Sequence, residues 1–402
     1  MRAAFGLVAA VLVGCGVDDG PVSQPPPEAL HQPPDFDDRV RPGTTLGPRP
    51  TPETGKLPVW QPGFHQALRW EVELAERTTL RIRVPSGRAG NQIRLAFRTG
   101  DGRGVLHGAT VALAGSDGAL ASDPVAVTFG GEPGFSAGAR ERRISDPLRF
   151  PVGFRQELYV TYEVEGHFAA GAIDLFPDSW AEVRVAPDAP VVAGWSERRA
   201  IGLASLLVRA PASRAFVALG DSITEAFISG DDDYRDAWPQ VAEALTGLPI
   251  ANAGVSGQGL WGAHEYLEGE VLQLEGVTDC IVLLGTNDLG AHDENRITSD
   301  LARLFERLEP FCTVWAGTLV PKDRAEIGEA IRRSRRAINT WIREEAAVAG
   351  VIDFEAVLGD PANPDRWLPG LGEDGVHPSL EGQRVMGEEA ARFLTEEVLG
   401  TR

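Results

Sequence analysis

The sequence contains little cysteine, and its three cysteines form no pattern of metal ligands. Cys15, Cys280 and Cys312 are spread over 402 residues, and no metal-ligand spacing of Cys or His appears. Positive charge is also scarce, because 38 Lys and Arg stand against 58 Asp and Glu, for a net charge of −20. Nucleic-acid binding needs clustered Lys and Arg, so this composition argues against a nucleic-acid partner.

The apolar run near the N-terminus is too short to cross a bilayer as a permanent helix. Arg2 precedes it, and it extends over Ala3–Gly14, a pattern typical of a secretion signal. Leu12, three residues before Cys15, gives its end a resemblance to a bacterial lipobox. Residues 1–15 are thus predicted to be a lipoprotein signal peptide, with Cys15 lipidated and the protein anchored to the cell envelope. The alternative is a plain signal peptide that contains a cysteine. By the same resemblance, Gly16 after the cysteine, in place of Asp, favours outward sorting over inner-membrane retention in a two-membrane bacterium; the anchored protein would be periplasmic or on the outer surface.

The next segments differ sharply in composition. Residues 16–55 are rich in Pro and acidic groups, so they are predicted to be a disordered tether. Residues 56–205 contain short stretches of alternating polar and apolar residues, such as Thr79–Val84, Gln92–Phe97 and Leu158–Val164. Gly, Pro and Asp separate these stretches. The pattern predicts an antiparallel, jelly-roll-like β-sandwich domain.

Residues 206–402 have a different period, in which short apolar runs alternate with amphipathic stretches. The amphipathic stretches include Arg324–Ala349 and Ser379–Leu399. The apolar runs are Ala215–Leu219, Ile250–Ala253, Cys280–Leu284, Thr313–Ala316 and Val351–Phe354. This alternation predicts an α/β domain in which helices cover both faces of a parallel sheet, a flavodoxin-like arrangement of three layers. In such sheets, sites lie beyond the carboxyl ends of the strands.

Four short polar blocks fall in this last region. They are Gly220–Thr224, Asn252–Gly254, Gly285–Asp288 and Asp374–Pro378, and the first three follow apolar runs. Taken alone, each block is an ordinary turn or helix cap. Their agreement on one edge of the predicted sheet favours a catalytic site.

The four blocks resemble those of the SGNH (or GDSL) esterases and lipases. The four residues that name the family match Ser222, Gly254, Asn287 and His377. A looser likeness extends to the N-terminal region and is similar to a two-domain branch related to acetyl-xylan-esterase-like members. This resemblance implies a serine esterase acting on short acyl esters, in particular acetyl esters of polysaccharides. It implies no cofactor and no bound metal.

The chemistry explains why these residue types are needed. A serine hydroxyl is a weak nucleophile until a base takes its proton, so Ser222 is predicted to attack the ester with His377 as the base. Asp374 is predicted to orient the imidazole and to stabilise its charged form. The oxyanion of the intermediate needs donors, for which we expect the amides of Ser222 and Gly254 and the side chain of Asn287. An acyl-Ser222 intermediate would then be hydrolysed by water.

Some neighbours of these residues are alternatives for the same roles. Glu373 is a minor rival of Asp374. Asp221 is expected to shape the turn before Ser222 and not to act as a second base, and Asp288 is expected to be structural. His264 and His292 follow the second and third blocks and could line the pocket, although solvated loop positions are favoured.

Two charged runs and a pair of cysteines have simple interpretations. Arg332–Arg336 and Asp231–Asp233 are expected to be solvated. Cys280 and Cys312 are expected to be buried. A disulfide is possible in an oxidising compartment, but neighbouring parallel strands rarely have its geometry, so two free thiols are favoured.

Two other functions are compatible with the sequence. One is a lipase or thioesterase on the same scaffold. The other is a surface carbohydrate-binding protein with a vestigial hydrolase domain, although none of the four blocks is missing.

Overall fold

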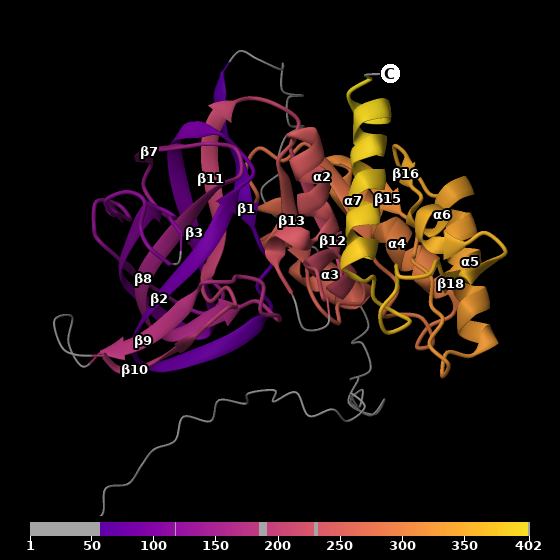
Figure 1. The fold of residues 1–402 in the computed structure, drawn as a ribbon, viewed down its shortest axis with the longest axis horizontal. Helices are drawn as coiled ribbons and strands as arrows, with labels where there is room; N and C mark the ends of the chain where they lie inside the picture. The colour runs from indigo at the N-terminus through magenta and orange to yellow at the C-terminus, as the bar shows by residue number, and fades with distance from the viewer. Residues whose placement is uncertain (1–56, 117, 185–190, 229–231, 401–402) are drawn as a thin grey trace, which may run out of the picture. The chain divides into compact units, whose positions relative to one another are not determined.

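A computed structural model describes residues 57–116, 118–184, 191–228 and 232–400. The predicted signal peptide, Cys15 and the predicted tether lie outside the described residues. Figure 1 shows the order of the elements along the chain. Within the described ranges, no helix is long and apolar enough to cross a membrane.

The first half of the chain, residues 58–211, forms an antiparallel sheet that we name the antiparallel region. Its strand order is β1-β11-β3-β8-β2-β9-β10, and β4 to β7 pair with β3. The strands are β1 (Pro58–His65), β2 (Trp70–Ser86), β3 (Gly90–Leu113), β4 (Val125–Val127), β5 (Phe135–Ala137), β6 (Arg142–Ile144), β7 (Leu148–Val152), β8 (Gln156–Ala170), β9 (Trp180–Arg184), β10 (Val191–Ser196) and β11 (Leu203–Pro211).

The long strand β3 joins two parts of this sheet. Its first half pairs with β11, β6 and β7, and its second half pairs with β8, β4 and β5. The register shifts between Thr99 and Gly104, where the strand passes from one set of partners to the other. Alternate side chains of both halves, such as Leu95 and Val111, enter one apolar core. This alternation is the physical basis of the period of two in the sequence.

The second half of the chain, residues 216–398, forms a parallel sheet covered by helices, which we name the parallel-sheet region. Its strand order is β13-β12-β14-β15-β16, and every adjacent pair is parallel. Numbered along the chain, this is the 2-1-3-4-5 order of flavodoxin-like folds. The strands are β12 (Phe216–Gly220), β13 (Ile250–Gly254), β14 (Asp279–Leu283), β15 (Thr313–Gly317) and β16 (Val351–Ile352).

Helices complete the layers of the parallel-sheet region. α2 packs against α7, and α4 packs against α3 and α5 (Figure 1). The helices are α1 (Ser222–Glu225), α2 (Trp238–Thr246), α3 (Leu260–Leu267), α4 (Glu294–Leu308), α5 (Glu329–Glu344), α6 (Phe354–Leu358) and α7 (Leu380–Phe393). Short helical turns are η2 (Tyr234–Asp236), η3 (Glu268–Leu272) and η4 (Leu394–Val398), and a small hairpin joins β17 (Gly359–Asp360) to β18 (Asn363–Trp367).

The predicted fold class is confirmed: an antiparallel sheet precedes an α/β unit with a parallel sheet. The five predicted strands all form, although β16 ends at Ile352 because Asp353 caps α6. The helix predicted from Arg324 begins only at Glu329, and residues before it form a loop. β11 carries the antiparallel sheet as far as Pro211, past the expected boundary at residue 205.

Cys280 and Cys312 form a disulfide, so the favoured interpretation of two free thiols is wrong. Their Cα atoms are 5.8 Å apart. Cys280 lies in β14, but Cys312 lies just before β15, in the turn that follows α4. Because Cys312 is outside the ladder, the usual geometry of neighbouring strands does not apply to this pair.

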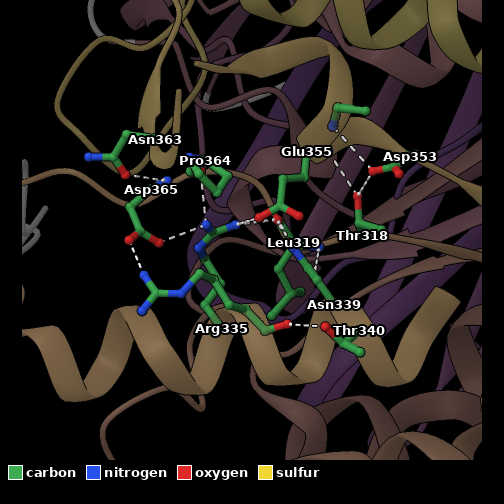
Figure 2. Close-up of polar contacts among 12 residues, drawn as sticks. Thr318, Leu319, Arg335, Asn339, Thr340, Asp353, Glu355, Asn363, Pro364 and Asp365 are labelled. Carbon is green, nitrogen blue, oxygen red and sulfur yellow. Dashed lines mark hydrogen bonds and ion pairs between the residues drawn. The ribbon is translucent and has the colours of Figure 1, made fainter. Parts of the chain in front are cut away.

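The run Arg332–Arg336 is only partly solvated, which corrects a second expectation. The side chain of Arg335 is 0% exposed. As Figure 2 shows, its guanidinium lies between the carboxylates of Glu355 and Asp365 and also binds the Pro364 carbonyl. The β17–β18 hairpin supplies Pro364 and Asp365, and it covers this face of α5.

The two regions are joined at the edge of the parallel sheet. Gln66, just after β1, forms a parallel bridge with Asn252 of β13. The next residue, Ala67, belongs to the apolar core of the parallel-sheet region. The antiparallel region therefore covers the edge strand β13, which would otherwise expose unpaired backbone groups.

Candidate active site

Ser222 stands at a sharp turn between β12 and α1. Asp221 caps α1, because its side chain accepts a hydrogen bond from the Ile223 amide at 3.0 Å. Gly220 ends β12, and a side chain there would clash with Thr224, since an added Cβ would lie 2.0 Å from its hydroxyl. The turn therefore needs a glycine, and it holds Ser222 at the carboxyl end of β12.

The structure brings three of the predicted site residues together in a chain of hydrogen bonds. Ser222 Oγ lies 2.9 Å from His377 Nε2. On the other side of the ring, His377 Nδ1 lies 3.0 Å from Asp374 Oδ2. Phe227 packs against the imidazole with ring centroids 4.6 Å apart. This is the arrangement in which an imidazole can take a proton from a hydroxyl while a carboxylate fixes its orientation.

The Asp374 carboxylate is held by its own loop and by Arg324. Its Oδ1 accepts hydrogen bonds from the backbone amides of Val376 and His377. Its Oδ2 accepts from the His377 ring and, at 2.7 Å, from the Arg324 guanidinium. Burial alone would raise the pKa of Asp374, but the hydrogen bonds from the ring and backbone of His377 hold this pKa well below its ordinary value. The contact to the ring comes from Asp374 and not from its neighbour Glu373.

The amide of Gly254 does not offer a free donor. It gives its hydrogen bond to the Asn252 side chain at 2.9 Å, and a Cβ at Gly254 would lie 2.2 Å from the Glu225 amide. This glycine therefore permits close packing of β13 against α1, which speaks against its predicted oxyanion role. The next glycine, Gly257, has a φ of +76°, and its amide makes no hydrogen bond within the part of the chain that is described.

Gly257 lies in a turn, residues 255–258, that we name the 255–258 turn. Gln258 ends the turn and donates from its side chain to the Gly220 carbonyl at 2.9 Å. Asn287, which follows β14, donates from its side chain to the Gln258 carbonyl at 3.0 Å. The predicted donor Asn287 therefore lies beside this turn, with a second amide hydrogen available. The sequence feature that points to this second donor is Gly257, the second glycine of the stretch Gly254-Val255-Ser256-Gly257.

Other acids near Ser222 have structural roles. Burial raises the pKa of Asp221 to about 6, and its cap to α1 accounts for its position. Asp288 accepts from the Leu260 amide at the start of α3, and burial raises its pKa as well.

A lysine, Lys322, is also buried near the site, and it donates to the Thr286 carbonyl at 3.0 Å. Burial lowers the pKa of Lys322, whose charge faces Asp221.

The remaining polar residues lie away from the triad contacts. His264 is buried in α3 and bonds to the Asp300 carbonyl of α4, so the expected solvated loop position is wrong. The amphipathic face of α3 explains this, because His264 points toward α4. His292 is exposed, as expected.

The acidic run Asp231–Asp233 is only partly described. Asp233 caps η2 and pairs with Arg235, so it is not simply solvated, and Asp231 lies outside the described residues. In the described ranges, no group of three or more His, Cys, Asp or Glu side chains could hold a metal ion.

Comparison with known proteins agrees with the geometry of the site. Residues 218–385 match the GDSL-like Lipase/Acylhydrolase family. The parallel-sheet region therefore matches a family of ester hydrolases. The matched range includes Ser222, Asn287 and His377, and it ends within α7. No curated protein matches the chain.

Several solved structures are similar to this chain. A lipolytic protein of the G-D-S-L family from Desulfitobacterium hafniense is 23% identical and covers 45% of this chain and 99% of its own, with a TM-score of 0.38. A family two carbohydrate esterase from Clostridium thermocellum, solved with cellohexaose, is 13% identical and covers 82% and 94%, with a TM-score of 0.38. The psychrotrophic esterase EstA from a Pseudoalteromonas species is 17% identical and covers 47% and 98%, with a TM-score of 0.37.

Proposed function

We propose that the protein hydrolyses carboxylic esters through an acyl-enzyme on Ser222. The observation that carries the proposal is the continuous set of hydrogen bonds from Ser222 through His377 to Asp374. As Ser222 Oγ attacks the ester carbonyl carbon, its proton passes to His377 Nε2. The imidazolium then returns this proton to the leaving alcohol, and a water molecule repeats the sequence to release the acid.

The oxyanion of each tetrahedral intermediate needs donors close to Ser222. We assign this role to the backbone amides of Ser222 and Gly257 and to the side chain of Asn287. Gly257 replaces the predicted Gly254, because the Gly254 amide is already bonded to Asn252. One such donor contributes about 10²–10³ in rate.

The substrate class that we propose is short-chain esters, in particular acetyl esters of carbohydrates. Resemblance of the sequence to acetyl-xylan-esterase-like members supports the carbohydrate part. The same resemblance supports the short acyl group. The other candidate is a lipase or thioesterase, which the name of the matching family also covers.

The test is hydrolysis of p-nitrophenyl esters by the purified protein and by Ser222→Ala. We expect Ser222→Ala to lose acetate hydrolysis, whereas Ser334→Ala, a half-buried serine on α5 whose hydroxyl binds Glu294, should retain wild-type turnover. Wild-type turnover in Ser222→Ala would refute the mechanism. Faster cleavage of octanoate than of acetate would instead favour the lipase candidate, and a screen of acetylated xylan and pectin would test the carbohydrate part.

We further propose that the protein is exported and anchored to the cell envelope through lipidated Cys15. The disulfide between Cys280 and Cys312 supports export, since disulfides persist in oxidising compartments. Palmitate labelling that persists in Cys15→Ala would contradict the anchor.

A further inference from the structure

The 255–258 turn is held on both sides of the proposed oxyanion donor Gly257. Toward β12, Gln258 binds the Gly220 carbonyl, two residues before Ser222. Toward β14, Asn287 binds the Gln258 carbonyl. These contacts come from the parallel-sheet region itself. Two further contacts lead out of it into the antiparallel region.

The first of these contacts runs through Glu225, a buried carboxylate on the helix that begins with Ser222. Its Oε2 accepts a hydrogen bond from the Ser256 amide at 2.6 Å. Its Oε1 accepts from the Gln66 side chain at 3.2 Å and from the Ala172 amide at 3.4 Å. Gln66 and Ala172 both belong to the antiparallel region. The carboxylate therefore ties that region to the residue directly before Gly257.

The second contact is made by Arg69, which lies between β1 and β2. Its guanidinium donates to Gln258 Oε1 at 2.5 Å and binds the buried carboxylate of Glu270 through two hydrogen bonds of 3.1 and 2.8 Å. The same guanidinium lies over the Tyr266 ring, 3.7 Å from its centroid. The Arg69 amide is bonded to the Ala170 carbonyl at the end of β8. Arg69 is thus fixed from both regions, and it reaches the residue directly after Gly257.

We propose that the antiparallel region positions the oxyanion donors of the esterase, with Gln66, Glu225 and Arg69 as the positioning residues. The proposal rests on the function proposed above. A backbone amide stabilises an oxyanion only when it is held at the right place before the charge develops. Gly257 is exposed and has a left-handed φ. The Gln258 amide closes its turn by donating to the Val255 carbonyl, and the flanking contacts hold this turn in place on both sides.

The test compares three variants of the full chain. Arg69→Met and Gln66→Met each remove one contact, and Arg83→Met is the matched control. Arg83 also binds two carboxylates, those of Glu157 and Asp178, but both lie within the antiparallel region. We expect Arg69→Met and Gln66→Met to lower kcat on p-nitrophenyl acetate by about 10- to 100-fold with little change in KM, because the loss falls on the transition state. Arg83→Met should retain wild-type kcat.

A second readout does not depend on activity. Amide hydrogen exchange of residues 255–258 should become faster in Arg69→Met and Gln66→Met than in Arg83→Met. Unchanged exchange in this turn together with wild-type kcat would overturn the proposal, and so would equal effects of Arg83→Met. If the wild-type protein hydrolysed no ester, the proposed function would fail, while the exchange comparison would still decide whether these residues position the turn.

Discussion

Each oxygen of the Asp374 carboxylate accepts two hydrogen bonds, and only one of the four comes from the imidazole that it orients. The backbone amides of its own loop fix one oxygen. Arg324 and His377 share the other. Such a carboxylate stays ionised, because its pKa is held below the ordinary value. It can therefore stabilise a positive imidazole whenever His377 carries the proton from Ser222.

Replacement of Asp374 tests this assignment at the scale of one residue. Asp374→Asn should lower kcat by about 10³- to 10⁴-fold, because the amide removes the charge and can favour the wrong tautomer of His377. Glu373→Gln, the same change at the neighbouring acid, should lower kcat far less. Steady-state kinetics on p-nitrophenyl acetate would measure both. Equal losses would mean that Asp374 has no special role.

The hydrogen-bonded set of Ser222, His377 and Asp374 could be predicted from the sequence, but the oxyanion donor that we propose at Gly257 could not. Ser222, Asp374 and His377 lie in short blocks whose residue types are fixed by chemistry. Gly254 and Gly257 are glycines three residues apart, and it takes the structure to distinguish them: the Gly254 amide is bonded to Asn252, and a Cβ at Gly254 would meet the Glu225 amide. Arg324 carries no motif, and its contact with Asp374 depends on how two distant loops meet.

At the scale of elements, burial of Arg335 is the clearest departure from the sequence pattern. The strands of the parallel sheet were predictable because they are continuous apolar runs. An arginine in a basic run on an amphipathic helix indicates a solvated face. The residues that bury it come from α6 and the β17–β18 hairpin, about 20 to 30 positions further along the chain. The spacing of apolar residues within α5 therefore cannot show that α6 and the hairpin cover Arg335.

Removal of Arg335 should destabilise the fold. Arg335→Met leaves the buried carboxylates of Glu355 and Asp365 without their shared partner, although Arg343 and Arg336 still reach them from the surface. The expected cost is about 3 kcal/mol, at the lower end for a broken buried pair. Urea unfolding would measure it. Arg384→Met, which breaks two exposed pairs on α7, should leave the unfolding free energy nearly unchanged. An unchanged unfolding free energy for Arg335→Met would contradict this account.

At the scale of the whole molecule, the two regions bury acidic groups where they meet. Glu243 of α2 accepts from the Ile250 amide at 3.0 Å. Gly87, between β2 and β3, packs so closely on it that an added Cβ would lie 2.0 Å from the carboxylate. Burial raises the pKa of Glu243 to about 8 and that of Glu225 to about 7. Between pH 4.5 and these raised values, each group therefore tends to keep in the folded protein a proton that the unfolded chain releases.

This burial predicts how stability depends on pH. The ordinary pKa of Glu243 is 4.5. The stability that the buried, protonated Glu243 contributes is therefore fully present below pH 4.5 and is lost as the pH rises through about 8. Between these two pH values, unfolding releases at most one proton from Glu243, so the unfolding free energy falls by at most about 1.4 kcal/mol per pH unit. Glu243→Gln cannot ionise, so its stability should fall less between pH 5 and 9. Glu344→Gln, on the exposed face of α5, should keep the wild-type slope. Parallel slopes for all three proteins would contradict the assignment.

The most direct test of the account is mass spectrometry of the protein after reaction with a fluorophosphonate. Such a reagent forms a stable ester with an activated serine and mimics the tetrahedral intermediate. We expect one adduct per chain, located by peptide mapping at Ser222, with no adduct in Ser222→Ala and much slower labelling in a His377→Ala variant. Labelling of another serine at the same rate in Ser222→Ala, or labelling at Ser222 that does not depend on His377, would contradict it.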